Sequence, residues 1–112
     1  MEVIKKFPET MDDRTSYKMM KSMEVKKMSD AEDSILEVKS WVKYSDVDNK
    51  TGELKEILTL ETVDGEMFGT VSDTFKREFD DIVKFFGDDV GSIKVVGGTS
   101  KAGRKFITCT VE

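Results

Sequence analysis

The chain of 112 residues contains no histidine and a single cysteine, Cys109. The absence of histidine removes the usual ligands of zinc sites and the base of Ser-His and Cys-His catalytic pairs. One cysteine cannot form a disulfide within the chain, and a free thiol suits a reducing compartment, so we expect a cytoplasmic protein. We also expect no cofactor and no enzymatic activity, because no spacing of carboxylates or lysines marks a catalytic site.

Long apolar runs and linkers are absent as well. No stretch of 18 apolar residues could cross a bilayer, and residues 1–6 are charged rather than apolar as in a signal peptide. With one proline and no Pro/Gly/Ser-rich segment, the chain shows no linker. Its length fits one compact domain, and we expect no association with a membrane.

Charge is abundant but unevenly distributed. The formal net charge is −5, and residues 30–91 carry seventeen acidic against seven basic side chains. Residues 92–112 carry four basic side chains and one acidic residue, Glu112. A basic segment of this kind can attract a polyanion locally although the whole chain is acidic.

The first 33 residues are predicted to form a helical extension followed by an arm. Thr10 and Asp13 have the spacing of a capping box, and lysines follow near the expected helix end, as the helix dipole favours. No dominant hydrophobic period follows in residues 23–33, which predicts an irregular arm. We therefore expect residues 1–33 to precede a β-rich unit over residues 34–112.

Three strand patterns follow the arm. Residues 34–44 and 53–63 alternate between apolar and polar side chains, and turn-forming residues lie between the two segments. Asp64-Gly65 is a strong hairpin signal, after which residues 66–71 return as a third strand. Together these segments predict an antiparallel meander.

A helix and two further strands complete the pattern. One of residues 72–74 is expected to cap the start of the helix, and Gly87 is expected to end it. Residues 92–96 and 105–111 are expected as the last two strands, on either side of a flexible loop. Apolar residues recur at helical spacing at Phe75, Phe79, Ile82, Val83 and Phe86.

The resulting order β-β-β-α-β-β is that of the OB-fold, a five-stranded Greek-key barrel. We therefore expect a mainly β protein with an OB-fold-like β-barrel over residues 34–112, preceded by an N-terminal helix. The phenylalanines of the second helix are expected to fill the bottom of the barrel. A β-grasp domain fits less well, because its helix usually follows the first hairpin.

The first strand offers a candidate nucleic-acid platform. Its alternation places Leu36, Val38, Val42 and Tyr44 in the core. On the opposite face it places Trp41 between Lys39 and Lys43. An aromatic ring can stack on bases while neighbouring ammonium groups contact phosphates. The alternative is that Trp41 covers a barrel end or packs under the N-terminal helix, since large aromatics are mostly buried.

The segment between the last two strands is a second candidate. Residues 97–105 are rich in glycine and carry three cations and no acid, in the position of a loop that borders the ligand groove of OB-folds. The alternative is a mobile hydrophilic turn. Phe106, Lys94 and Phe68 alternate with apolar neighbours and share the predicted groove face, although Phe68 fits the core equally well. The full set of candidate nucleic-acid-binding residues is Lys39, Trp41, Lys43, Phe68, Lys94, Lys101, Arg104, Lys105 and Phe106.

Several segments carry a resemblance to a known family. They are residues 44–53 (YSDVDNKTGE), 68–79 (FGTVSDTFKREF) and 93–109 (IKVVGGTSKAGRKFITC), and the start at residues 6–10 (KFPET) is similar too. The chain resembles small single-stranded-DNA-binding proteins encoded by phages and prophages of Gram-positive bacteria. The resemblance implies an OB-fold, sequence-tolerant binding of single-stranded DNA, and a role in DNA replication or recombination.

A second interpretation stays open at this point. The acidic region of residues 46–89 would suit a non-enzymatic protein-interaction module of β-barrel fold with an acidic partner-binding face. Replication or recombination proteins are then further candidate partners. The seven methionines are compatible with self-association.

Overall fold

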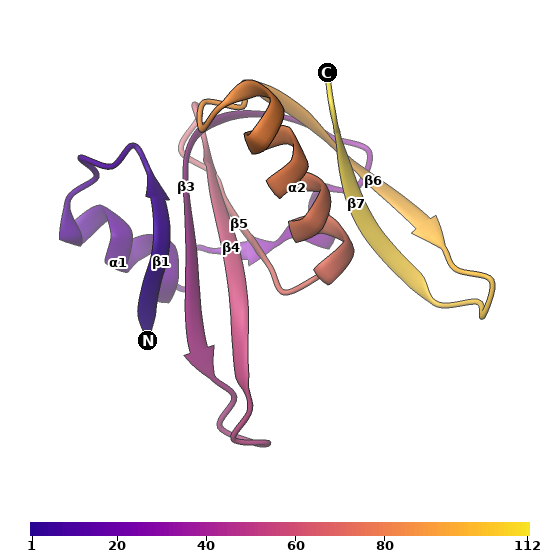
Figure 1. Cartoon of the computed structure of the whole chain (residues 1–112), viewed down its shortest axis with the longest axis horizontal. Helices are drawn as coiled ribbons and strands as arrows, with labels where there is room; N and C mark the ends of the chain where they lie inside the picture. The colour runs from indigo at the N-terminus through magenta and orange to yellow at the C-terminus, as the bar shows by residue number, and fades with distance from the viewer.

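The long strand β3 is the axis of the fold. The computed structural model describes residues 1–112, and Figure 1 shows their arrangement. The elements in chain order are β1 (Glu2–Phe7), α1 (Asp13–Lys21), β2 (Lys26–Lys27), the 3-10 helix η1 (Met28–Ala31), β3 (Ile35–Val47), β4 (Leu54–Thr62), β5 (Met67–Thr70), α2 (Asp73–Phe86), β6 (Ser92–Thr99) and β7 (Lys105–Val111). None of the helices is long and apolar enough to cross a membrane.

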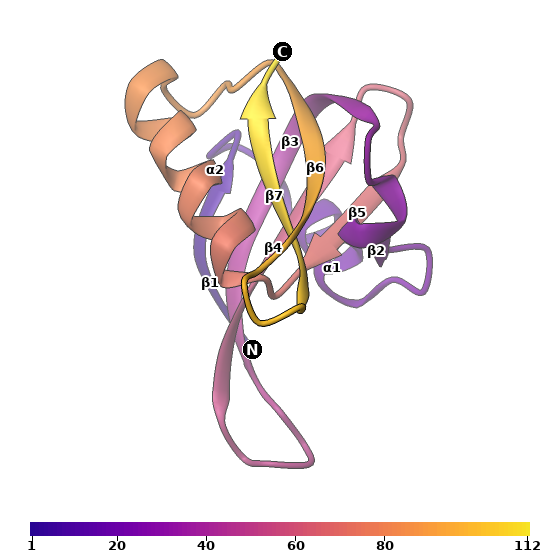
Figure 2. The ribbon, with the colours of Figure 1, turned by 90° about the vertical axis from the view of Figure 1, so that its right-hand side faces the viewer.

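All strands belong to one curled sheet. Along it the order is β2-β5-β4-β3-β6-β7, and β1 pairs with β3 off this path. β3 pairs with β4 over Val38–Val47 and with β6 over Ile35–Glu37, so a single strand joins the two halves of the sheet. β5 and β7 do not pair, which leaves the sheet as an open half-barrel. Figure 2 shows α2 on one side of the β6–β7 hairpin and η1 with β2 on the other.

The predicted order of elements in residues 34–112 is confirmed as β3-β4-β5-α2-β6-β7. The structure adds two strands, β1 within the predicted helical extension and β2 within the predicted irregular arm. It also extends β6 through Gly97 and Gly98 to Thr99, where the sequence predicts a loop. The protein is therefore mainly β, with two α-helices and a curled half-barrel sheet.

A bulge in β3 decides which side chains enter the core. The register of β3 against β4 shifts between Val38 and Ser40. An extra residue in a strand moves every later side chain to the opposite face. Trp41 is therefore buried, with 1% of its surface exposed, and the prediction that it lies on a solvated face is wrong.

The inner face of the half-barrel is filled by α2. Phe75 and Phe79 are fully buried, and the ring of Phe79 meets Trp41 edge-on with centroids 5.4 Å apart. Edge-to-face aromatic pairs add stability beyond the area they bury. The prediction that helix phenylalanines fill the barrel is confirmed for these two residues. It is wrong for Phe86, which is 55% exposed because the last turn of α2 extends beyond the core.

Both ends of α2 have the predicted caps. The Ser72 hydroxyl accepts a hydrogen bond from the Phe75 N–H at 3.2 Å, which satisfies one of the free donors of the first turn. Gly87 ends the helix with a φ of 89°, a conformation that glycine adopts without steric cost. These caps set the residues at which α2 begins and ends.

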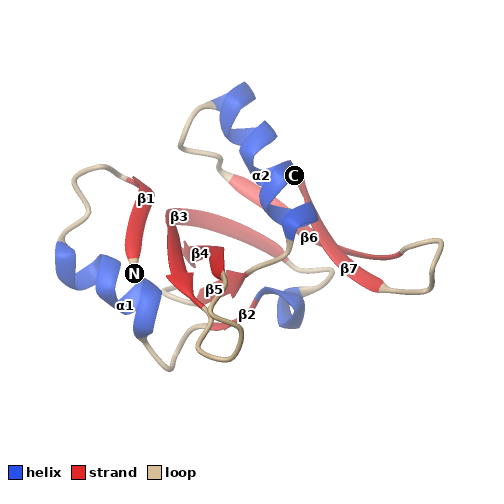
Figure 3. Cartoon of the chain, turned by 60° about the horizontal axis from the view of Figure 1, so that its bottom comes forward, coloured by secondary structure: helices blue, strands red, loops and turns tan.

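The outer face of the sheet is partly covered by α1. Met19 of the helix packs with Val42, Tyr44 and Met67 in a second buried cluster. The helix is capped by Asp12, whose carboxylate accepts from the Thr15 N–H at 2.7 Å, rather than by Thr10 as predicted. Figure 3 shows α1 and β1 at one end of the molecule and the β6–β7 hairpin at the other.

Candidate nucleic-acid interface

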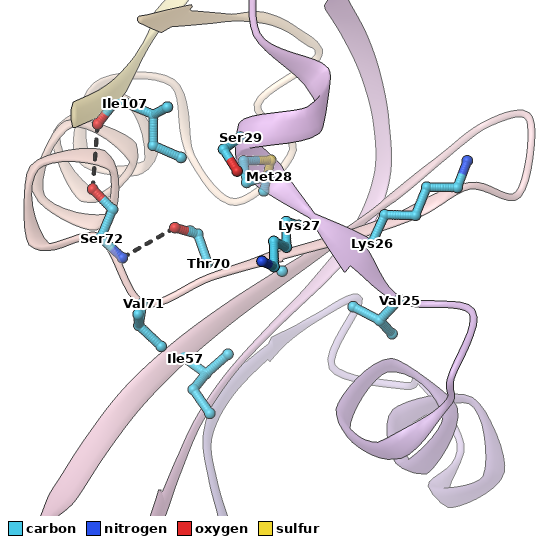
Figure 4. Close-up of a pocket in the computed structure, with 11 residues that line it drawn as sticks. Val25, Lys26, Lys27, Met28, Ser29, Ile57, Thr70, Val71, Ser72 and Ile107 are labelled. Carbon is cyan, nitrogen blue, oxygen red and sulfur yellow. Dashed lines mark hydrogen bonds between the residues drawn. The ribbon is translucent and has the colours of Figure 1, made fainter. Parts of the chain in front are cut away.

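A groove opens where α1 leaves the outer face of the sheet uncovered. Its main cavity has a volume of about 520 Å³. In Figure 4, Ile57 and Val71 lie on one side. Val25, just before β2, and Lys26 of β2 lie on the other side, and Ile107 of β7 lies at the far end. The lining is largely aliphatic, so this part of the groove can contact the faces of planar or apolar groups.

Gly69 of β5 keeps this cavity open. A Cβ atom at this position would lie 3.2 Å from Cγ1 of Val25 and 3.5 Å from Oγ1 of Thr59. Any larger side chain would therefore push against the arm before β2. The glycine allows the arm and β5 to approach closely while the space between them stays free.

A second cavity of about 410 Å³ continues the first one toward the β6–β7 hairpin. The two cavities share Ser29, Ser72 and Ile107, and the second adds Glu32, Lys105 and Phe106. We call the combined feature the central groove. Its residues are Val25–Ser29, Glu32, Ile57, Gly69–Ser72 and Lys105–Ile107.

Cations without acidic partners border the central groove. Lys27 and Lys105 line it, and Lys101 and Arg104 lie exposed at the turn of the adjoining hairpin. None of the four takes part in an ion pair of the molecule. Lys26 differs, because it pairs with Glu66 at 3.3 Å. The four unpaired cations are therefore free to meet an external anion.

The structure brings together the predicted residues of the β6–β7 hairpin. Lys101, Arg104, Lys105 and Phe106 lie along its turn and at the start of β7. Phe106 is 37% exposed and its ring covers Gly98, its partner in β6. The predicted alternation of β7 is confirmed, because Ile107 and Cys109 face inward.

Lys94 lies on the same face of the hairpin as Phe106. Its cross-strand partner is Thr110, and this pair lies four pairs along the ladder from the Gly98–Phe106 pair. Because side chains in a strand alternate, this face looks away from the inward-facing Ile107. Phe106 still contributes to the lining of the second cavity, whereas Lys94 lies outside the central groove.

The structure does not bring the remaining candidates to this surface. Trp41 lies in the core, where its indole N–H donates to the Asp88 carbonyl at 2.8 Å. Phe68 is also buried, as the alternative interpretation of that residue anticipated. Lys43 points toward α2 and forms an ion pair with Asp80, with 14% of its side chain exposed. The solvent-facing positions predicted for Trp41 and Lys43 are wrong because of the bulge in β3.

Lys39 stands apart from both groups. It lies at the bulge of β3, where it is exposed and makes no ion pair.

The sequence did not predict the arm residues Val25, Lys26 and Lys27, which form one wall of the groove. The lysine pair is visible in the sequence, but no periodicity indicates that the arm lies against β5.

The thiol of Cys109 lies behind β7 and is not part of the groove. Burial, with a smaller effect of the Glu78 carboxylate, raises its pKa to about 12.

Burial also raises the pKa of the Tyr44 hydroxyl. This hydroxyl donates a hydrogen bond to the Met20 carbonyl at 3.1 Å and so holds α1 against the sheet. No group of three or more residues is arranged to hold a metal ion.

Fold and site together define a half-barrel protein with an aliphatic groove that is bordered by unpaired cations. The chain belongs to the family of phi29-type phage single-stranded DNA-binding proteins, whose family model matches residues 2–112. This confirms the resemblance noted in the sequence. Single-stranded DNA is accordingly the partner, and the family is one of DNA-binding proteins without enzymatic activity. Comparisons with curated proteins and with solved structures gave no match.

Proposed function

We propose that the protein binds single-stranded DNA along the central groove and the β6–β7 hairpin, with little sequence preference. The observation that carries this proposal is the set of four unpaired cations, Lys27, Lys101, Arg104 and Lys105, on and beside an aliphatic groove. Phosphates would contact these cations, while base faces would contact the groove and the ring of Phe106. The biological setting would be replication or recombination of phage DNA in the host cytoplasm.

The architecture supports the same assignment. In OB-folds, the second and third strands and two hairpin loops form the surface that binds oligonucleotides. β4 and β5 occupy these positions in the order of elements, and the central groove lies on their outer face beside the β6–β7 hairpin. We therefore assign the half-barrel to the OB type, with α1, β1 and β2 as additions to it.

Removal of the hairpin cations tests the proposal. The variant R104A/K105A should bind a fluorescent oligo-dT about tenfold more weakly at low salt, because two phosphate contacts are lost. The slope of log affinity against log salt concentration should fall by about 1.4, at roughly 0.7 per contact for a single strand. Both quantities come from titrations followed by fluorescence anisotropy.

A matched control removes two exposed and unpaired cations from another surface. Arg77 and Lys84 lie on α2, away from the groove lining, and neither forms an ion pair. R77A/K84A changes the net charge by the same amount and should leave the salt slope unchanged. Equal losses in both double variants would mean that the DNA is attracted by overall charge and would contradict the proposed site.

A further inference from the structure

We propose that Glu32 gives the central groove a preference for bases with an exocyclic amino group over thymine. This inference rests on the proposed function of the groove and names a contact within it. The bases concerned are cytosine, guanine and adenine. The preference is superimposed on the general affinity for single strands, which the phosphate contacts supply.

The backbone around Glu32 is held on both sides. Its own N–H donates to the Ser29 carbonyl at 3.3 Å, and the next residue, Asp33, donates to the Val95 carbonyl of β6 at 2.7 Å. Asp33 has a positive φ of 69°, which turns the chain from η1 toward β3. Glu32 is therefore placed at a fixed point between η1 and β6.

The side chain of Glu32 lies directly on β6. A Cβ atom added at Gly97 would overlap the Glu32 carboxylate. Gly97 pairs with Ile107, so this is the inward face of the hairpin, where Lys105 and Ser29 also line the second cavity. The carboxylate thus occupies the end of the central groove at the β6–β7 hairpin.

The carboxylate has no cationic partner in the protein. None of the ion pairs includes Glu32, although Lys105 lines the same cavity. A carboxylate repels phosphate, so a strand bound here has to turn a base, not its backbone, toward Glu32. The phosphates then lie at the bordering cations.

The chemistry of an ionised carboxylate sets the preference. It accepts hydrogen bonds and donates none. The amino groups of cytosine, guanine and adenine donate to it, as in the glutamate–cytosine contacts of protein–DNA complexes. Thymine presents two carbonyl oxygens around a single N–H, so its pairing edge is mostly repelled. We expect the wild-type protein to bind oligo-dC about fivefold more tightly than oligo-dT of equal length, at the lower end of such discrimination.

Two variants with a matched control test the inference. E32Q should bring the dC to dT affinity ratio close to one, because an amide both donates and accepts. D30N removes the same charge two residues away, at a side chain outside the central groove, and should leave the ratio unchanged. Titrations of all three proteins with both oligonucleotides at one salt concentration give the ratios.

The variant G97A provides an independent test, because it keeps the charge of Glu32. The added methyl group displaces the flexible end of the Glu32 side chain, and a thermal melt verifies that the fold is retained. G97A should abolish the preference as E32Q does. A wild-type ratio of one, or a ratio that neither variant changes, would overturn this inference and leave the groove intact. Binding that is insensitive to R104A/K105A would instead overturn the proposed groove itself.

Discussion

At the scale of single residues, Cys109 links burial to chemical reactivity. Its side chain is buried under α2, and its thiol lies 3.8 Å from the Phe75 carbonyl. Because the thiolate is the nucleophile and the pKa is raised to about 12, the native thiol is almost entirely protonated at pH 8.

Alkylation measures this burial. Iodoacetamide at pH 8 should leave the native protein unmodified over a time in which the urea-unfolded chain reacts completely, as followed by mass spectrometry. Because the raised pKa makes the native state bind more protons, this thiol's contribution to stability is present below the unfolded pKa of about 9 and is lost as the pH rises above it. Native labelling at the rate of a free thiol would show that α2 does not cover Cys109.

Residue-level prediction succeeded or failed according to the regularity of each strand. In β7 the alternation is uninterrupted, so the outward position of Phe106 follows directly from the sequence. In β3 the bulge after Val38 inverts the alternation, and nothing in the residues themselves marks that position. Trp41 was therefore predicted on the wrong face, because a bulge is fixed by pairing with β4 and not by local sequence.

At the scale of elements, α2 contains phenylalanines of opposite roles. Phe79 is fully buried against Trp41, whereas Phe85 is 82% exposed and rests on Phe86. F79A should lower the free energy of unfolding by about 3–5 kcal/mol, through lost burial and a residual cavity.

The variant F85A is the matched comparison on the same helix. It should change the free energy of unfolding by less than about 0.5 kcal/mol, as is usual for exposed positions. Urea denaturation of both variants provides the test. A large loss in F85A would indicate that Phe85 contacts something in solution that the single chain does not show.

Elements with their own local signals could be predicted, and elements defined by contacts could not. Ser72 and Gly87 are recognisable caps, so the bounds of α2 follow from the sequence. β2 has two residues and exists only because Lys26 and Lys27 pair with β5. The groove wall that these lysines form was consequently missed, whereas the cationic hairpin of residues 97–105 was found from composition alone.

At the scale of the molecule, DNA binding and stability should be coupled. A ligand that binds only the folded state at one hundred times its dissociation constant stabilises it by about 2.7 kcal/mol. For a domain of this size, that corresponds to a rise in Tm on the order of 10 °C. Thermal melts with saturating oligo-dT should show this rise, and R104A/K105A should show a smaller one at the same DNA concentration. An unchanged Tm would exclude binding that is selective for the folded protein.

The open seam between β5 and β7 has a consequence for the lifetime of the protein. No strand pairing closes the seam. The hairpin beyond it pairs with the rest of the sheet over Ile35–Glu37 of β3, with two further backbone hydrogen bonds between Val95 and residues 33–34. A strand of DNA bound in the proposed central groove would contact both β5 and β7 and so bridge the seam. The DNA-free protein would then open and be cleaved by a protease sooner than the DNA-bound protein. Occupancy by DNA would in this way decide which copies persist in the cell.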